Sequence, residues 1–297
     1  MVADPEGAIR DRALGAYLGF AAGDALGATV EFMTAREIAA HHGVHRDITG
    51  GGWLRLAPGQ VTDDTQMALA LGSAILASGG WNLRAAADAF AAWLRTRPPD
   101  VGNTCRRGIQ RYVATGEPQT PVNEGDAGNG ALMRNLPVCL AFLRDDAGFE
   151  RATLEQARIT HNHPLSDAAC LALGRMTRRL VLGEGRDACR EEAEALVRAQ
   201  PKFRFDPYPG RASGYVVDTV QTVLHHFFSC ESLEECVVET VNRGDDADTT
   251  GALAGMLAGA LHGAQAVPGR WRRRLDPGVV EEIRRQGDGL LALPGNT

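Results

Sequence analysis

Two stretches of the chain place glycine at every fourth residue, and this spacing constrains the fold more than any other feature of the sequence. The glycines stand at positions 15, 19, 23 and 27, and again at 251, 255, 259 and 263. Such a spacing puts the glycines of each stretch on one face of an α-helix. Each interior glycine destabilises a helix by about 1 kcal/mol relative to alanine, so both rows need a compensating gain. We expect both helices to lie in the middle of a helical bundle, where a face without side chains lets a neighbouring helix approach closely.

Apolar residues recur at helical spacing along most of the remaining sequence, as in the segments 64–78, 83–95, 166–183 and 214–228. Alternation of period two is scarce. The longer irregular stretches fall at 41–61, 97–104, 117–130 and 200–212. A chain of 297 residues, 44% of them hydrophobic, can bury a large core, and no linker or repeat divides it. We therefore predict an all-α fold, a single compact multi-helix domain over residues 1–297.

Charge and cysteine content exclude several classes of protein. The net charge of −6 is spread along the chain, and we interpret the basic run at 270–277 as a solvated helix face rather than a nucleic-acid site. The six cysteines contain no C-x-x-C motif, which is typical of buried thiols in a reducing compartment. Asp24 and His262 interrupt the two most apolar segments, so we expect no transmembrane segment, and the N-terminus lacks the layout of a signal peptide. These features predict a cytoplasmic protein.

Two acidic clusters stand directly before apolar helical segments. Asp63 and Asp64 form the first, and Asp245, Asp246 and Asp248 form the second. Adjacent carboxylates and hydroxyls at two helix N-termini are the oxygen ligands that a hard divalent cation prefers. Four or more carboxylates could hold two such ions, so the sequence predicts a binuclear metal site at helix N-termini.

Two other interpretations of these acids compete with the metal site. Helix capping, by Asp63 with Gln66 or by Asp248 or Thr249, accounts for one carboxylate in each cluster but not for the others. An EF-hand loop starting at residue 246 would need a glutamate at its twelfth position, where the chain has Leu257. Glu31 follows the first glycine row and could project into the same place as the two clusters.

Five segments of the sequence resemble successive signatures of the ADP-ribosylglycohydrolases. They are GAYLGFAAGDALGATVEF, TDDTQMALAL, GNGALMRNLPV, THNHP and GDDADTTGALAGMLAGA, in the family's order and spread over residues 13–275. The resemblance implies an all-α fold and two divalent cations, Mn²⁺ by preference and Mg²⁺ as the alternative. It also implies hydrolysis of the N-glycosidic bond that joins ADP-ribose to a protein arginine. Hydrolysis of a serine or poly-ADP-ribose linkage, an inactive ADP-ribose-binding protein and a two-metal phosphohydrolase remain as alternatives.

The resemblance also implies the metal ligands, which are Thr62, Asp63, Asp64, Asp246, Asp248 and Thr249. The family usually has Gly-Gly-Asp-x-Asp-Thr at the second cluster, whereas this chain has Asp245 in place of the second glycine. Counting back from Asp248 assigns the ligand to Asp246, with Asp245 left as the alternative.

Two acids are expected to carry the chemistry. We assign Glu31 to water activation and Asp100 to proton transfer at the ribose, because both match family residues near the metals or the substrate. The alternative for Asp100 is a loop residue that caps the next helical turn.

Other residues are expected to bind the substrate, namely Asn103, Gly128, Asn129, Gly130, Met133, His161 and Tyr215. The glycine-rich segment 124–135 would run into a helix and cradle the diphosphate with its backbone N–H groups. An ordinary glycine turn with Asn129 as N-cap is the alternative. Tyr215 would stack on adenine or, alternatively, be a buried aromatic residue at the start of a helix. His163 is expected to pack beside Pro164.

The partners come from the resemblance alone. It implies an ADP-ribosylated protein substrate, the nitrogenase iron protein, and control by a PII-type nitrogen-signalling protein. We expect a monomer, membrane association only through such a partner, and no nucleic acid.

Overall fold

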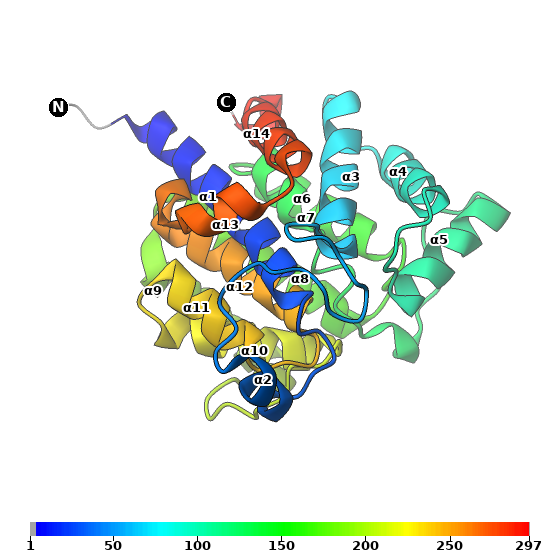
Figure 1. Ribbon diagram of the computed structural model, residues 1–297. Helices are drawn as coiled ribbons and strands as arrows, with labels where there is room; N and C mark the ends of the chain where they lie inside the picture. Colours follow the sequence, from blue (N-terminus) through cyan, green and yellow to red (C-terminus); the bar gives the residue numbers. More distant parts are fainter. Residues whose placement is uncertain (1–3, 297) are drawn as a thin grey trace.

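Helices α1 (Pro5–Gly27) and α12 (Ala247–His262) run side by side through the middle of the molecule (Figure 1). The computed structural model describes residues 4–296, and its regular elements over that range are helices. Three isolated backbone bridges lie in the segments that connect them. The all-α prediction is therefore confirmed.

The two glycine rows face each other across the contact between α1 and α12. A Cβ atom placed on Gly19 would lie 2.2 Å from the carbonyl oxygen of Gly255, and one on Gly255 would lie 2.1 Å from the carbonyl oxygen of Gly19. Comparable contacts join Gly15 to Gly259 and Gly23 to Gly251. No side chain fits at such distances, so the two backbones touch directly. The predicted central position and tight packing are confirmed, whereas the sequence did not reveal that the rows pair with each other.

Five helices pack against this central pair: α3 (Asp63–Ala77), α8 (Pro164–Leu182), α10 (Val216–Ser229), α11 (Leu233–Val241) and α14 (Pro277–Leu291). The outer helices are α2 (Ala35–His42), α4 (Leu83–Arg95), α5 (Asn103–Thr115), α6 (Leu136–Ala141), α7 (Asp146–Ala157), α9 (Gly185–Ala199) and α13 (Gly269–Arg274). In Figure 1, α4 and α5 lie beyond α3, on the side away from α11.

Helix α6 begins later than the apolar residues at helical spacing over 130–144 predict. Residues 130–134 form turns, and α6 starts only at Leu136. The carbonyl oxygen of Asn129 accepts the N–H groups of Leu132 and Met133, which closes a turn there. Pro137 then fixes the first turn of the helix with its restricted φ. The glycine-rich segment 124–135 therefore does run into a helix, as predicted, although the helix starts at its end rather than at residue 130.

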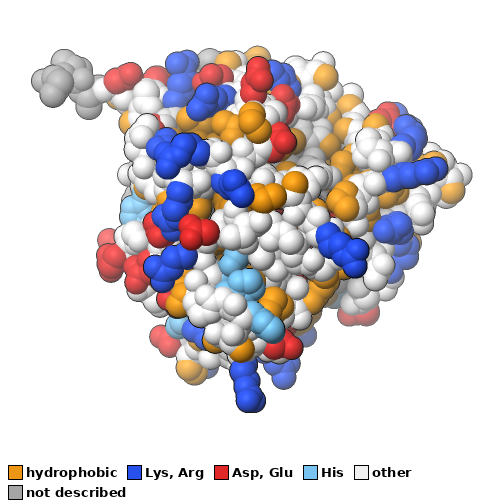
Figure 2. Space-filling view, viewed as in Figure 1, with side chains coloured by type: hydrophobic (Ala, Val, Ile, Leu, Met, Phe, Trp, Pro, Cys, Tyr) orange, Lys and Arg blue, Asp and Glu red, His pale blue; other side chains and the backbone are white. Residues whose placement is uncertain are grey.

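The surface is mixed in charge on the face that Figure 2 shows, where basic and acidic side chains are interspersed. Within the basic run, Trp271 is buried while Arg273 and Arg274 are exposed, as predicted for a solvated helix face. All six cysteines are buried and free. Over the described part of the chain, no helix has both the length and the hydropathy needed to cross a membrane.

Candidate active site

The N-terminal turns of α3, α5 and α12 meet at a cavity of about 350 Å³. Each N-terminus presents backbone N–H groups that have no partner within the helix itself, and the positive end of a helix dipole. The cavity is lined by Glu31, Phe32, Asp63, Asp64, Asp100, Gly102, Asn103, Thr104, Cys105, Gly128, Asn129, Gly130, Met133, His161, Gly214, Asp246, Asp248 and Thr249. The fold thus brings together acids that are far apart in the sequence.

The carboxylates at these helix starts are not used as caps. The N-cap residues are Thr62 for α3, Gly102 for α5 and Asp246 for α12, and none of them makes a side-chain capping bond. The capping interpretations of Asp63 and Asp100 are therefore wrong. Asp248 accepts the N–H of its neighbour Thr249 at 2.9 Å through one of its oxygens.

Three acids from different segments converge closely enough to share a cation. Glu31, Asp100 and Asp248 each offer a carboxylate oxygen, and these oxygens lie within 4.8 Å of one another. Asp64 is 1% exposed, and its Oδ1 atom has no hydrogen-bond partner among the described residues. A buried carboxylate oxygen without a donor is costly unless a cation binds it. This donor set, which consists of oxygens alone, fits a hard divalent cation.

Burial raises the pKa of every acid in this cluster. Desolvation raises the pKa of Asp246 to about 6, and the pKa values of Asp63, Asp64 and Asp248 lie well above the usual range for the same reason. Desolvation, followed by repulsion from neighbouring acids such as Asp100, raises the pKa of Glu31 to about 8. The fold therefore destabilises these negative charges when no cation is present.

We expect the metal-free protein to lose stability as the pH rises from about 4 to about 8. The folded protein holds protons on Asp24 and Asp246, with pKa values of about 6, and on Glu31, with a pKa of about 8. The unfolded chain releases those protons near pH 4, so their stabilising effect is complete below that pH and is lost progressively as the pH rises from there through the folded pKa values of about 6 and about 8. Thermal unfolding of metal-stripped protein across this range measures the effect. A midpoint that stays constant or rises with pH would contradict it, and a saturating concentration of a bound divalent cation should abolish the decline.

Asp24 does not line the cavity but holds the start of α3, which carries Asp63 and Asp64. The sequence analysis did not identify it as a functional residue. Its side chain is fully buried and accepts the backbone N–H groups of Thr62 at 3.0 Å and Thr65 at 3.1 Å. It also accepts the hydroxyl of Thr65 at 2.5 Å. These bonds fix the first turn of α3 to α1. Thr62 does not line the cavity, but its hydroxyl donates to Asp64 at 3.3 Å. The sequence feature that could have identified Asp24 is its position, because it is an acidic residue in the middle of a predicted helix of small apolar residues.

His161 forms a wall of the cavity next to two glycines. It is 2% exposed, and a Cβ atom on Gly130 would lie 2.7 Å from its Cε1 atom, so the backbone approaches the ring closely. Burial and the positive charge of Arg134 lower the pKa of His161 far below the usual value, which keeps the ring neutral. The neutral ring could donate a hydrogen bond to a polar ligand or accept one from it.

Asn129 ties the glycine-rich segment to the second acidic cluster. Its amide nitrogen donates to the hydroxyl of Thr219, at 3.0 Å, and to the carboxylate of Asp246. The N-cap interpretation of Asn129 is therefore wrong. His163 caps α8, because its Nδ1 atom accepts the N–H of Leu165 at 3.0 Å.

Tyr215 and Asp245 lie outside the cavity lining. Tyr215 is the N-cap of α10 and is 38% exposed, so the interpretation as a buried aromatic residue is wrong. It forms a backbone bridge with Gly128, next to the cavity-lining Gly214. Asp245 is exposed and has a φ of +55°, whereas Asp246 lines the cavity.

A larger hollow of about 760 Å³ lies beside α8, but its charges are matched. Its arginines pair with acids, for example Arg178 with Asp146 at 2.7 Å and Arg179 with Glu184 at 2.7 Å. Its acids are paired with arginines, whereas the smaller cavity holds the unpartnered carboxylate oxygen of Asp64 and the converging acids, so the candidate site is the smaller cavity.

A family model described as ADP-ribosylglycohydrolase matches residues 5–296 of this chain. The chain belongs to the ADP-ribosylglycohydrolase family. Among curated members, it is 60% identical to the ADP-ribosyl-[dinitrogen reductase] glycohydrolase of Rhodospirillum rubrum, over 97% of this chain and 98% of that protein. It is 30% identical to the ADP-ribosylarginine hydrolase Tri1 of Serratia proteamaculans, over 91% of this chain and 77% of that protein.

A solved structure has the same fold. It is titled an ADP-ribosylglycohydrolase-related protein complex and superimposes with a TM-score of 0.87 at 35% sequence identity. The match covers 97% of this chain and 99% of that chain. The likeness therefore extends over the whole helical bundle, including the segments that carry the acidic clusters.

Proposed function

We propose that this protein hydrolyses the N-glycosidic bond between ADP-ribose and an arginine side chain of a target protein. The observation that carries the proposal is the convergence of Glu31, Asp100 and Asp248 beside the first acidic cluster, at three helix N-termini and next to His161. The names of the Rhodospirillum and Serratia relatives support the substrate class. The Rhodospirillum name also supports the nitrogenase iron protein as the target, which hydrolysis would reactivate.

The proposed cofactor is a pair of divalent cations, Mn²⁺ by preference, with Mg²⁺ as the alternative. The residues proposed to hold them are Thr62, Asp63, Asp64, Asp246, Asp248 and Thr249. Bound cations would orient the ribose hydroxyls and lower the pKa of a bound water. The unpartnered Oδ1 atom of Asp64 and the raised pKa values around it support this assignment.

The chain's own residues would move the protons. Glu31 is proposed to accept a proton from the attacking water, and Asp100 to transfer a proton at the ribose. The guanidine leaving group is strongly basic, so it must leave with its proton retained. His161, Asn103 and Met133 would contact the ADP-ribose, the glycine-rich segment would hold the diphosphate, and Tyr215 would stack on adenine.

The deciding experiment measures release of free ADP-ribose from ADP-ribosylarginine and from ADP-ribosylserine, side by side, with metal-stripped and metal-loaded protein. We expect metal-dependent release from the arginine substrate only. Release from the serine substrate instead would identify another linkage, and tight ADP-ribose binding without release would identify a binding protein. Formation of AMP or phosphate would identify a phosphohydrolase.

Replacing Asp100 with asparagine should separate binding from chemistry. The amide keeps the size of the side chain, so both metals and ADP-ribosylarginine should still bind. The side chain would no longer carry a proton at the reacting ribose, so kcat should fall about 10²- to 10⁴-fold. Steady-state kinetics on ADP-ribosylarginine measures this change. If KM rises while kcat is unchanged, Asp100 only positions the substrate.

The remaining proposals concern the cellular setting. We propose a cytoplasmic monomer, controlled by a PII-type protein that could also bring it to a membrane. Six buried, unpaired cysteines support a reducing compartment. Size-exclusion chromatography coupled to light scattering tests the monomer directly.

A further inference from the structure

The indole of Trp53 makes a direct hydrogen bond to a proposed catalytic acid. Its Nε1 atom donates to the Oε2 atom of Glu31 at 2.6 Å. Glu31 is 6% exposed and lines the cavity, whereas Trp53 is 53% exposed and lies outside the lining. We propose that Trp53 is a positioning residue that occupies one carboxylate oxygen of Glu31 and leaves the other free for the cavity. This inference rests on the proposed function.

A second aromatic ring holds the indole in place. Phe32 lies against Trp53 with ring centroids 5.3 Å apart and an interplanar angle of 48°. Phe32 has a φ of +64°, which is unfavourable for a bulky residue, and its N–H donates to the carbonyl oxygen of Asp245 at 2.7 Å. Strained backbone of this kind persists where the surrounding structure over-determines it, and it is common at functional sites. The strain places the ring of Phe32 beside the indole.

Three consecutive glycines let the loop that carries Trp53 turn tightly and pack closely against the segment before Glu31. Gly50, Gly51 and Gly52 all have positive φ angles. A Cβ atom on Gly52 would lie 2.4 Å from the carbonyl oxygen of Ala28, so this part of the loop lies directly on the segment that leads to Glu31. Reciprocal backbone hydrogen bonds of 2.8 and 2.9 Å between Gly51 and Leu56 close the turn around Trp53.

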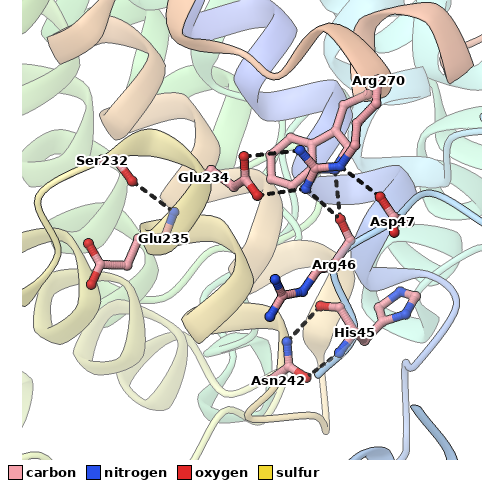
Figure 3. Close-up of polar contacts among 9 residues, drawn as sticks. His45, Arg46, Asp47, Ser232, Glu234, Glu235, Asn242 and Arg270 are labelled. Carbon is pink, nitrogen blue, oxygen red and sulfur yellow. Dashed lines mark hydrogen bonds and ion pairs between the residues drawn. The ribbon is translucent and has the colours of Figure 1, made fainter. Parts of the chain in front are cut away.

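The beginning of the same loop is anchored to distant helices, as Figure 3 shows. Arg270 donates to Asp47 at 2.7 Å and to Glu234 at 2.6 Å. Asn242 exchanges two hydrogen bonds with the backbone of His45, at 2.9 and 2.8 Å. The loop is thus held at both the beginning and the turn, so Trp53 approaches Glu31 from a fixed support.

The hydrogen bond has a consequence for how Glu31 can act. A carboxylate with both oxygens free can bind a cation through both of them, and each oxygen is then less basic toward a proton from water. An indole N–H on one oxygen occupies one of its lone pairs and competes with this bidentate arrangement. Trp53 would therefore keep Glu31 available as a base beside the metals.

The test removes the N–H donor but keeps an aromatic ring. In Trp53→Phe, the contact with Phe32 is retained and the bond to Glu31 is lost. We expect kcat on ADP-ribosylarginine to fall about 10- to 100-fold, the range for loss of one hydrogen bond to a charged group, with KM within about twofold of the unchanged protein. The affinity of metal-stripped protein for Mn²⁺, measured by titration calorimetry without substrate, should increase by about twofold or more as both oxygens become free.

Two further variants show whether the donor itself matters. In Trp53→His, the imidazole Nε2–H can take the place of the indole N–H, because the two five-membered rings superimpose, so most of the kcat should return. Trp81→Phe is the matched control: Trp81 donates to Glu155 at the same distance of 2.6 Å, and neither residue lines the cavity. This control should keep the original kcat and Mn²⁺ affinity.

Three results would overturn the inference. They are an unchanged kcat in Trp53→Phe, an unchanged Mn²⁺ affinity in the same variant, and a Trp53→His protein as impaired as Trp53→Phe. If the original protein fails to hydrolyse ADP-ribosylarginine at all, the proposed function fails, and the Mn²⁺ titration still decides the role of Trp53.

Discussion

Replacing Asp248 with asparagine is expected to abolish hydrolysis, a loss on the order of 10³-fold or more, together with loss of bound metal. The carboxylate is 2% exposed and lies within 4.8 Å of those of Glu31 and Asp100, so an amide there removes a buried negative charge from the proposed ligand set. Helicity and stability without metal should change little, because one of several mutually repelling carboxylates disappears. Metal analysis, ADP-ribose release and circular dichroism measure the three effects. Asp63→Asn should behave in the same way.

Asp245 provides the matched control for this prediction. It is an acid of the same cluster, but it is exposed, does not line the cavity and has a φ of +55°, which glycine adopts without strain. Asp245→Gly should therefore keep its metal and its activity. If this variant loses the metals, the second ligand cluster is assigned to the wrong aspartate. Full activity of the unchanged enzyme after metal removal would contradict the metal site altogether.

The fold was predictable from the sequence where its cause is local. The four-residue spacing of glycine indicates a helix face without side chains, and the apolar periodicity of the other segments indicates helices. Each pattern lies within one short segment of the sequence, so both features could be predicted without knowing the fold. The capping alternatives stayed open at that level. They could be rejected only once the N-caps were known to be Thr62, Gly102 and Asp246, without side-chain capping bonds.

The features that the sequence did not reveal depend on contacts between distant segments. Asp24 bonds to Thr62 and Thr65, about forty residues away, and Trp53 reaches Glu31 from a loop whose course is set by Arg270. No spacing rule links such positions. The late start of α6 has another origin, because the turn closed by the Asn129 carbonyl outweighs the helical periodicity of the residues that follow.

These contacts connect the glycine rows to the site. The rows set how close α12 lies to α1, and α1 carries Asp24, which holds the first turn of α3. The proposed ligands of α12 and those of α3 are therefore positioned relative to each other through the backbone of α1. A change at the glycine contact should reach the metals without touching a ligand.

Gly255→Leu should both destabilise the protein and weaken metal binding. A Cβ atom at this position would lie 2.1 Å from the carbonyl oxygen of Gly19, so α12 must move away from α1 to accommodate any side chain. We expect a loss of at least about 3 kcal/mol in the free energy of unfolding, the upper end of the usual range for overpacking. Metal affinity should fall as well, because ligand distances are tolerated only within about 0.2 Å. Denaturant unfolding and metal titration measure the two effects.

A pair of alanine substitutions separates the contact from helix propensity. Gly287 also lies inside a helix, α14, but a Cβ atom there would meet nothing within 4 Å. Gly287→Ala should therefore stabilise the protein by up to about 1 kcal/mol, whereas Gly255→Ala should destabilise it despite the same gain in helix propensity. If Gly255→Ala is as stable as Gly287→Ala and binds metal as tightly as the unchanged protein, the glycine rows do not set the distance between the ligand clusters.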